Sequence, residues 1–278
     1  MTKGKTLLTT KDYLVTKEAF DLVHDPTYDM LLTHPQPTDH SKYYETINYI
    51  SHSDTAKNLF ESLYQKVKKY TLGKKVKLIN HYANSNKSLL DIGCGTGEFL
   101  SYAKKHHWKI QGVEVSDSAR KKAEDKNITV HESLFKFSNI KFSVITLWHV
   151  LEHLPNLKKN IQQIESLLAD DGTLIIAVPN YKSYDAQFYK EYWAAFDTPR
   201  HLWHFSQTSI SKIFNEYNFQ IKKTLPMYFD SYYVSLLSEK YKNGKINYPN
   251  AIYRGWLSNI KAKSSGEYSS LIYVLKKR

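Results

Sequence analysis

The glycine-rich stretch at residues 88–98, Ser-Leu-Leu-Asp-Ile-Gly-Cys-Gly-Thr-Gly-Glu, restricts the possible folds of this chain more than any other feature. Its first five residues form a mainly apolar run that stops at glycine, which is typical of a buried strand. Gly93, Gly95 and Gly97 then allow a tight loop, because glycine lets the backbone turn sharply and approach a ligand closely. The amide groups at the start of the following helix face that ligand. The stretch therefore predicts a strand, a loop and a helix, with a binding site at the end of the strand.

Two acidic residues stand where strands are predicted to end. Asp91 precedes the loop in the spacing Asp-x-Gly-x-Gly-x-Gly, and its negative charge repels a pyrophosphate but suits a ligand with a cationic amino-acid end. Glu114 follows 23 residues later, where a carboxylate can accept hydrogen bonds from ribose hydroxyls. The alternative is an ordinary strand–turn–helix whose glycines serve only the geometry of the turn.

Predicted strands alternate with predicted helices from residue 88 onward. Continuous apolar runs separated by amphipathic segments are typical of an α/β protein with a doubly wound parallel sheet. The predicted strands cover residues 88–92, 109–115, 128–130, 142–148, 173–178, 219–225 and 269–276.

The residues before this alternation are predicted to form a separate unit. Apolar residues recur at helical spacing between residues 59 and 67, which predicts helices over 55–72 and 74–82. We expect residues 1–87 to form an N-terminal helical cap over the ligand site and residues 88–278 to form the main domain. A tyrosine-rich insertion at about 230–266 interrupts that domain, with a helix at 231–241 and loop for much of the rest.

The glycine loop, Glu114 and the strand order together resemble the class I S-adenosylmethionine (SAM)-dependent methyltransferases. The similarity is greatest for the branch grouped with ubiquinone and sugar methyltransferases, and it covers residues 88–225 and the terminal strand. The resemblance implies a seven-stranded, Rossmann-like sheet whose final strand is antiparallel. It also implies that SAM is the cofactor and S-adenosylhomocysteine (SAH) the product.

The resemblance assigns a set of cofactor-binding residues. Ser133 stands where relatives often carry an acid, so adenine recognition is expected to use backbone groups near Leu134. The aromatic face of Trp148 suits a cationic sulfonium, although core packing is an equally good interpretation of that residue. Tyr49 is expected from the cap. The full set is Asp91, Gly93, Gly95, Gly97, Glu114, Val115, Ser133, Leu134, Trp148 and Tyr49.

A segment at residues 193–205 is dense in aromatic residues and histidines and resembles the Pro-Arg-His-x-x-His-Phe stretch of the same branch. Histidine can remove a hydroxyl proton as the methyl group arrives. The candidate catalytic bases are His153, His201 and His204, with His201 favoured, and Arg200 is expected to hold an anionic acceptor. The alternative is that these histidines only fill or cap the fold.

The string His149-Val-Leu-Glu152-His153 also matches the inverted zinc-protease motif His-x-x-Glu-His. That motif requires both histidines on one helix, whereas His149 is predicted at a strand end, so a zinc protease is not expected. Some relatives bind a divalent metal through a Glu/His cluster here. No second ligand cluster stands out in the sequence, so no metal ligand is assigned.

The charge of the chain, +12, is concentrated in its flanks, and residues 239–278 carry nine basic and two acidic residues. A basic flank is compatible with nucleic acid or an anionic membrane surface as well as with solvent. We expect O-methylation of a small-molecule acceptor: a sugar, polyketide, quinone or lipid-like compound. The alternatives are an RNA methyltransferase and a non-catalytic module that binds SAM or nucleic acid. Nucleic acid is the less favoured partner because no common RNA-binding motif is present.

The sequence contains neither a signal-peptide pattern nor an apolar run of transmembrane length. Its one cysteine, Cys94, lies inside the glycine loop and is interpreted as a small filler. A chain without an internal disulfide fits the reducing cytoplasm, which is the expected location.

Overall fold

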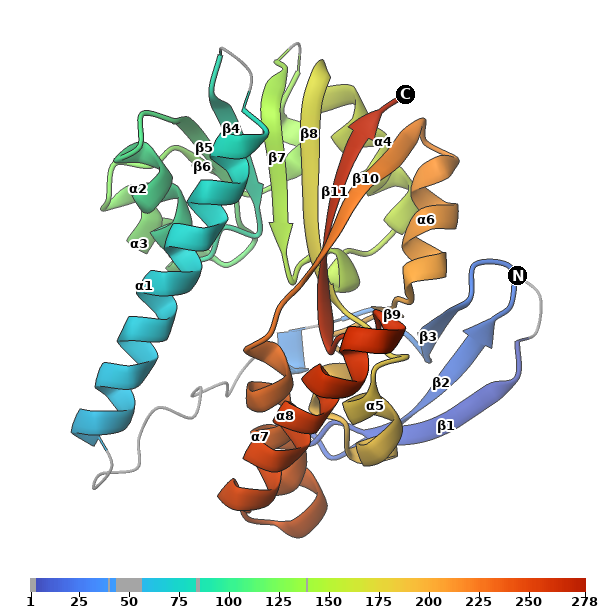
Figure 1. Ribbon diagram of the computed structural model, residues 1–278. Helices are drawn as coiled ribbons and strands as arrows, with labels where there is room; N and C mark the ends of the chain where they lie inside the picture. The colour runs from blue at the N-terminus through green and yellow to red at the C-terminus, as the bar shows by residue number, and fades with distance from the viewer. Residues whose placement is uncertain (1–3, 40, 44–56, 84–85, 139) are drawn as a thin grey trace.

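The computed structural model describes residues 4–39, 41–43, 57–83, 86–138 and 140–278, with the backbone alone at 41 and 57–66 (Figure 1). The strands are β1 (Thr6–Lys11), β2 (Ala19–Asp25), β3 (Met30–His34), β4 (Ser88–Ile92), β5 (Lys109–Val113), β6 (Val130–His131), β7 (Phe142–Trp148), β8 (Leu168–Pro179), β9 (Trp203–His204), β10 (Phe219–Pro226) and β11 (Ser270–Lys277). The α-helices are α1 (Lys57–His81), α2 (Glu98–Lys104), α3 (Asp117–Glu124), α4 (Leu157–Leu167), α5 (Tyr184–Tyr189), α6 (Gln207–Asn215), α7 (Asp230–Asn243) and α8 (Tyr248–Ser265).

A seven-stranded sheet in the order β10-β11-β8-β7-β4-β5-β6 forms the centre of the molecule. The pairs from β8 to β6 are parallel, whereas β11 runs antiparallel to both β8 and β10. Asp91 pairs with Gly112 on one side and with Thr146 on the other, so the strand before the glycine loop is central. The predicted α/β class, the seven strands and the antiparallel final strand are confirmed.

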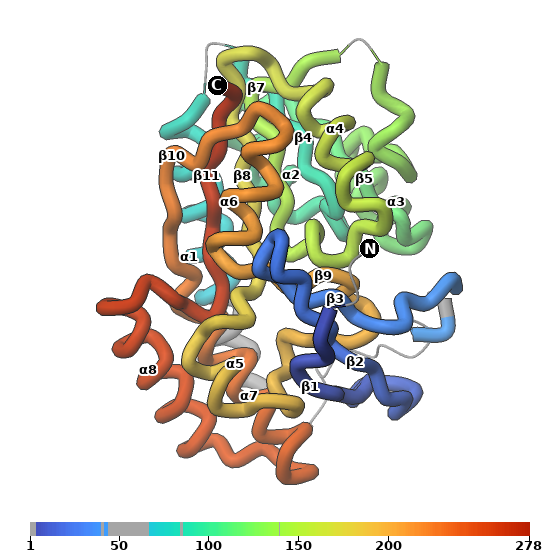
Figure 2. Tube along the Cα trace, turned by 90° about the vertical axis from the view of Figure 1, so that its right-hand side faces the viewer, coloured from blue at the N-terminus to red at the C-terminus, as the bar shows by residue number. Residues whose placement is uncertain are grey.

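Side chains that alternate along the central strands form an apolar layer on each face of the sheet. Leu89 and Val144 pack on the side covered by α1 and α2. Their neighbours Leu90 and Ile145 pack on the opposite side, against α4 and α6, which Figure 2 views directly. Because both faces are covered, the strands are apolar along their length, as expected of a parallel sheet.

A second, antiparallel sheet in the order β1-β2-β3-β9 corrects the prediction of a helical cap, which is wrong for residues 6–34. Leu22 and Leu31 of this sheet pack with Trp193 and Phe196 from the aromatic segment. Each strand is short, and β3 finds its partner β9 some 170 residues further along the chain, where Leu31 pairs with His204. Local periodicity therefore gave no sign of the pairing.

Two further predictions of local structure are wrong. A single helix, α1, runs through Gly73, where two helices were predicted. Most of the region after α7 was predicted to be loop, yet it forms α8, an 18-residue helix that Asn247 caps at its N-terminus. Both views place α5, α7 and α8 with the small sheet at one end of the large sheet, the end to which the arrowhead of β7 points (Figures 1 and 2).

Within the described part of the chain, every helix is too short or too polar to cross a bilayer.

Candidate functional site

The loop after β4 turns through three glycines with positive φ: Gly93 (+70°), Gly95 (+54°) and Gly97 (+74°). A Cβ on Gly93 would lie 2.3 Å from a methyl carbon of Val150, and one on Gly97 would lie 2.9 Å from the Cβ of Ala123. At Gly95, no heavy atom of the described residues lies within 4 Å of the Cβ position. Gly93 and Gly97 thus serve close packing, whereas Gly95 borders open space.

Glu114 follows β5 and fastens the loop. Its Oε2 accepts a hydrogen bond from the amide of Gly95, and its Oε1 accepts one from the amide of Ser116, both at 2.9 Å. A carboxylate offers about four acceptor positions, so both oxygens can still accept from a ligand hydroxyl. Val115, the next residue, leaves 81% of its surface exposed, which places an apolar side chain beside the acceptor group.

Asp91 is buried at the end of β4, and the hydroxyl of Thr146 donates to its Oδ1 at 2.6 Å. Burial raises the pKa of Asp91 to about 7, although the Thr146 hydrogen bond and the charge of Lys75 act in the opposite direction. Burial likewise lowers the pKa of Lys75, against the attraction of Asp91 and Asp230. A cationic ligand group at this position would stabilise the ionised carboxylate.

Trp148 ends β7 within contact of α1 and α2. Its ring lies 5.7 Å from the ring of Phe99, and Lys75 Nζ lies 4.3 Å from its centroid. Among the described residues its Nε1 has no hydrogen-bond partner although the atom is buried. An unsatisfied buried donor of this kind is costly in a native protein and is a feature expected beside a ligand.

The two residues predicted near adenine lie after β6. The Ser133 hydroxyl accepts from the amide of Phe135 and caps a 3₁₀ turn at Leu134–Lys136. Leu134 is buried, and its expected backbone contact with adenine stays a prediction. Tyr49 lies outside the described residues.

The three candidate histidines come together, but they differ in surroundings. The ring centroids of His153 and His201 lie 4.4 Å apart, and those of His201 and His204 lie 6.4 Å apart. His201 and His204 are buried. Burial holds the pKa of His201 well below its ordinary value and lowers the pKa of His204 to about 3. Both imidazoles are therefore neutral at pH 7.

Hydrogen bonds fix the tautomers of these rings, because a backbone carbonyl can only accept. His201 Nδ1 faces the carbonyl of Ala195 at 2.9 Å, and His153 Nδ1 faces the carbonyl of Arg200 at 3.0 Å. Nδ1 of each ring therefore carries a proton, and because His201 is neutral its Nε2 keeps a lone pair. His204 differs: its Nε2 donates to the hydroxyl of Thr33 at 3.0 Å, since that hydroxyl donates its own hydrogen to the His201 carbonyl.

Glu152 joins this cluster to the end of β7. Its carboxylate is buried, and His149 Nδ1 lies 3.4 Å from its Oε1, within ion-pair distance. The other ring nitrogen of His149 lies 3.0 Å from Asp230 Oδ2 at the start of α7. Burial acts to lower the pKa of His149, but the two carboxylates outweigh it and raise that pKa to about 10. His149 is therefore a cation at neutral pH.

Arg200 does not face an acceptor site, which corrects the prediction that it binds an anionic acceptor. Only 2% of its surface is exposed. Its Nη2 donates to Asp12 at 2.9 Å and to Asp197 at 2.7 Å, and its Nη1 donates to the carbonyl of Tyr43. The guanidinium joins the small sheet to the aromatic segment, and its charge is already balanced by two carboxylates.

Comparison with known proteins identifies the family. A family model described as a methyltransferase domain matches residues 64–224, more than half of the chain. The chain belongs to the class I SAM-dependent methyltransferases. SAM is accordingly its cofactor, as the glycine loop predicted.

Curated relatives of this methyltransferase include ubiquinone biosynthesis O-methyltransferases. The protein of that name from Actinobacillus pleuropneumoniae serotype 7 is 31% identical over 108 residues, covering 34% of this chain and 46% of the relative. The one from Coxiella burnetii is 30% identical over 110 residues, covering 35% and 47%. The chain spans about half the length of these relatives.

Solved structures share the fold at low sequence identity. A SAM-dependent methyltransferase from Archaeoglobus fulgidus gives a TM-score of 0.52 at 18% identity, covering 79% of this chain and 100% of that one. Magnesium protoporphyrin IX methyltransferase from Synechocystis PCC 6803, with bound SAH, gives 0.50 at 16% identity, covering 75% and 83%.

The surroundings of the glycine loop fit the chemical groups of SAM. Open space borders Gly95, a buried carboxylate at Asp91 suits the ammonium group, and Glu114 retains acceptor capacity for the ribose. The exposed side chain of Val115 offers an apolar contact for a flat base. Sequence reasoning missed Lys75, which reaches Trp148 only because α1 packs across the sheet.

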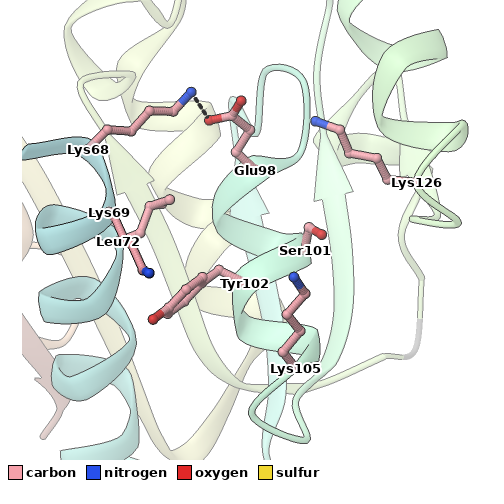
Figure 3. A pocket seen from close by; sticks show the side chains of 8 residues that line it. All are labelled: Lys68, Lys69, Leu72, Glu98, Ser101, Tyr102, Lys105 and Lys126. Carbon is pink, nitrogen blue, oxygen red and sulfur yellow. Dashed lines mark ion pairs between the residues drawn. The ribbon is translucent and has the colours of Figure 1, made fainter. Parts of the chain in front are cut away.

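A surface hollow of about 340 Å³ lies between α1 and α2, next to the end of the glycine loop, where its lining residue Lys126 donates to the carbonyl of Thr96 (Figure 3). Four lysines and Glu98 line much of it, and Lys68 pairs with Glu98 at 2.5 Å. Leu72, Ser101 and Tyr102 complete its wall. None of the residues predicted to bind SAM or to act in catalysis lines this hollow.

Proposed function

We propose that this methyltransferase moves a methyl group from SAM to a hydroxyl oxygen of a small-molecule acceptor of the sugar, polyketide, quinone or lipid-like classes. One observation carries the proposal: two imidazoles, His153 and the neutral His201, lie with Glu152 in a cluster that follows β7. A hydroxyl loses its proton when it is methylated, so the reaction benefits from a neutral base nearby. The naming of the curated relatives as O-methyltransferases supports the same reaction.

The cluster connects to the proposed cofactor site through short contacts. The side chain of Val150 packs against Gly93 of the glycine loop. His149, which precedes Val150 in the chain, contacts Glu152 of the cluster. When bound, SAM supplies an electrophilic methyl group. The chain's own residues hold donor and acceptor in line and keep water away, which is the main requirement of such a displacement.

We assign the proton removal to Nε2 of His201 or His153. In the neutral form of either ring the lone pair lies on Nε2, because Nδ1 donates to a backbone carbonyl. His149 is a poor base because its raised pKa keeps it protonated. His204 is a weaker candidate than the sequence indicated, since Thr33 engages its Nε2 within the core. Of the two, His201 stays our first choice.

The same cluster also fits the divalent metal that some relatives bind here. Glu152, His153 and His201 each offer one ligand atom, and these atoms lie within 4.8 Å of one another. Both oxygens of Glu152 are buried without a hydrogen-bond partner among the described residues, which suits a ligand role. These three residues would hold the ion, and its Lewis acidity toward the acceptor oxygen would then replace the imidazole base, because the Nε2 atoms of both histidines would be ligands.

Incubation with methyl-labelled SAM and a panel of phenolic, sugar and lipid-like hydroxyl compounds tests the reaction, with mass spectrometry locating the label. We expect the label on oxygen. His201→Ala should lower turnover about 10²–10⁴-fold while leaving SAM affinity nearly intact. His106→Ala, at an exposed histidine after α2, is the control and should keep full turnover.

The pH dependence provides a second readout that does not depend on how well the alanine variant packs. Because the pKa of His201 lies well below 6.5, the wild-type rate should complete its rise below pH 6.5 and stay level above it. Label on nitrogen or carbon, or near-normal turnover in the single alanine variants of both His153 and His201, would contradict the assignment.

A further inference from the structure

The outer face of α8 carries a stripe of large apolar side chains that face solvent. The spacing of four residues, 248, 252, 256 and 260, keeps them on one side of the helix. Each is exposed to an unusual degree for its type. We call this set the α8 stripe: Tyr248 (54% exposed), Ile252 (57%), Tyr253 (50%), Trp256 (49%) and Ile260 (38%).

The opposite face of α8, which packs against the protein, carries small residues. The large apolar side chains of this helix thus face solvent and its small ones face the core, the reverse of the usual arrangement. Its buried positions are Ala251, Gly255, Ser258 and Ala262. A Cβ on Gly255 would lie 2.8 Å from the Cα of Tyr232, which shows how closely α7 and α8 approach. A surface helix normally turns its large apolar side chains to the core. Here close backbone packing fills the inner face and leaves the apolar side chains outside.

The surroundings of the stripe are basic. Residues 240–265 contain six basic residues and no acidic residue, and Lys242, Lys245, Lys261 and Lys263 among them are exposed. The acidic residues on either side of this range are engaged in hydrogen bonds: Glu239 accepts from Tyr189, and Glu267 accepts from Asn180. The apolar stripe therefore sits in a field of uncompensated positive charge.

We propose that the α8 stripe docks on an anionic membrane surface. Tyrosine and tryptophan prefer the boundary between headgroups and acyl chains, where their rings are buried and their polar atoms stay wet. Lysines next to such a stripe gain from the negative surface potential of anionic lipids. A helix with an apolar face and a basic border that lies in the interface plane is the usual form of this interaction. The proposal does not depend on which acceptor is methylated.

The charge argues against a second copy of the chain as the occupant of this face. A twofold contact would place the same surface on both sides, and two lysine-rich borders would repel each other. The position of the stripe is also suitable. α8 lies at an outer edge of the molecule in Figure 2, packed on α7, and the first residue of α7, Asp230, contacts His149 in the candidate site.

Co-sedimentation of the full chain with sucrose-loaded vesicles tests the proposal. One set of vesicles is phosphatidylcholine alone, and the other contains phosphatidylglycerol as well. We expect binding to the anionic vesicles that weakens with added salt, and much weaker binding to the neutral ones. The double variant Ile252→Ser/Trp256→Ser should lower the partition coefficient at least about tenfold, equivalent to about 1.4 kcal/mol. Because both side chains are exposed, its thermal midpoint should stay near that of the wild type.

Ile140→Ser is the matched control. Ile140 is 41% exposed and precedes β7, at the opposite end of the large sheet, so its variant should bind vesicles as the wild type does. Failure to bind anionic vesicles, or equal binding by the double variant and the wild type, would overturn the proposal. The proposal would also be overturned if the wild type did not bind vesicles but formed a dimer in sedimentation equilibrium, or bound total RNA, and the double variant lost that dimer or RNA binding.

Discussion

Gly95 and Gly97 lie two residues apart in the loop after β4, yet the structure predicts opposite results when each is changed to alanine. Both have positive φ, which costs a non-glycine residue about 1–2 kcal/mol. At Gly95 the added methyl group meets no described atom within 4 Å. At Gly97 it would lie 2.6 Å from Ile128 Cδ1 and 2.9 Å from Ala123 Cβ. Such overpacking adds about 1–3 kcal/mol.

We therefore expect Gly95→Ala to fold with an unfolding free energy about 1 kcal/mol lower than that of the wild type. The cost of the positive φ is partly offset because alanine restricts the unfolded chain more than glycine does. Gly97→Ala should lose about 2–4 kcal/mol. Urea denaturation followed by tryptophan fluorescence measures both. In calorimetric titrations, by contrast, Gly95→Ala should lower the affinity for SAM and SAH at least about tenfold, since its methyl group enters the space that we assign to the ligand.

The reasoning fails if Gly95→Ala binds SAM as tightly as the wild type while its unfolding free energy is nearly unchanged. The open space beside Gly95 would then not be the cofactor site. A large stability loss in Gly95→Ala would instead contradict the packing of the loop, since nothing in the described structure opposes the methyl group.

Three further predictions use the same physical chemistry. Because burial raises the pKa of Asp91 to about 7, SAM affinity should rise about eightfold between pH 6 and 7.5 as the carboxylate ionises, and Asp91→Asn should abolish this dependence in calorimetry. His204 has a pKa of about 3 in the folded protein and about 6.5 in the unfolded chain, so it contributes stability that is fully present above pH 6.5 and is lost as the pH falls. Between pH 7.5 and pH 5.0 the unfolding free energy of the wild type, measured by denaturation, should therefore fall by about 2 kcal/mol more than that of His204→Gln. An equal loss in both proteins would contradict the burial argument. Arg200→Met leaves the buried Asp12 without its cation and should cost about 3–5 kcal/mol in the same assay. Lys136→Met, which removes a pair with Glu132 that is exposed on both sides, should cost about 0–1 kcal/mol.

Local sequence pattern was sufficient for the large sheet and for the cofactor. Consecutive side chains such as Leu89 and Leu90 face opposite sides of a strand, and here both are buried. A short apolar run between a polar linker and a glycine therefore predicts a strand covered on both faces. The spacing from Asp91 to Glu114 follows from one strand–helix–strand unit, which places both carboxylates at the same edge of the sheet.

The roles of the histidines and of Arg200 could not be predicted in this way. His204 and Arg200 belong to a motif whose residue types suggest catalysis and substrate binding. However, the partner of His204 is Thr33 on β3, about 170 residues away, and the partner of Arg200 is Asp12 after β1, about 190 residues away. Whether a polar side chain faces a substrate or the core depends on which distant segment packs against it. Periodicity within a short window contains no information about that segment.

The sequence by itself determined the glycine loop, the succession of strands and helices that form the large sheet, and the family, because each depends on residues that are neighbours along the chain. Only the tertiary structure decided that residues 6–34 form strands, that His201 keeps a lone pair on Nε2, and that α8 turns its large side chains outward. The physical reason is the same in all three cases. Hydrogen bonding between β3 and β9, the carbonyl of Ala195 beside His201, and the close packing of α7 on Gly255 are contacts that exist only after the chain has folded.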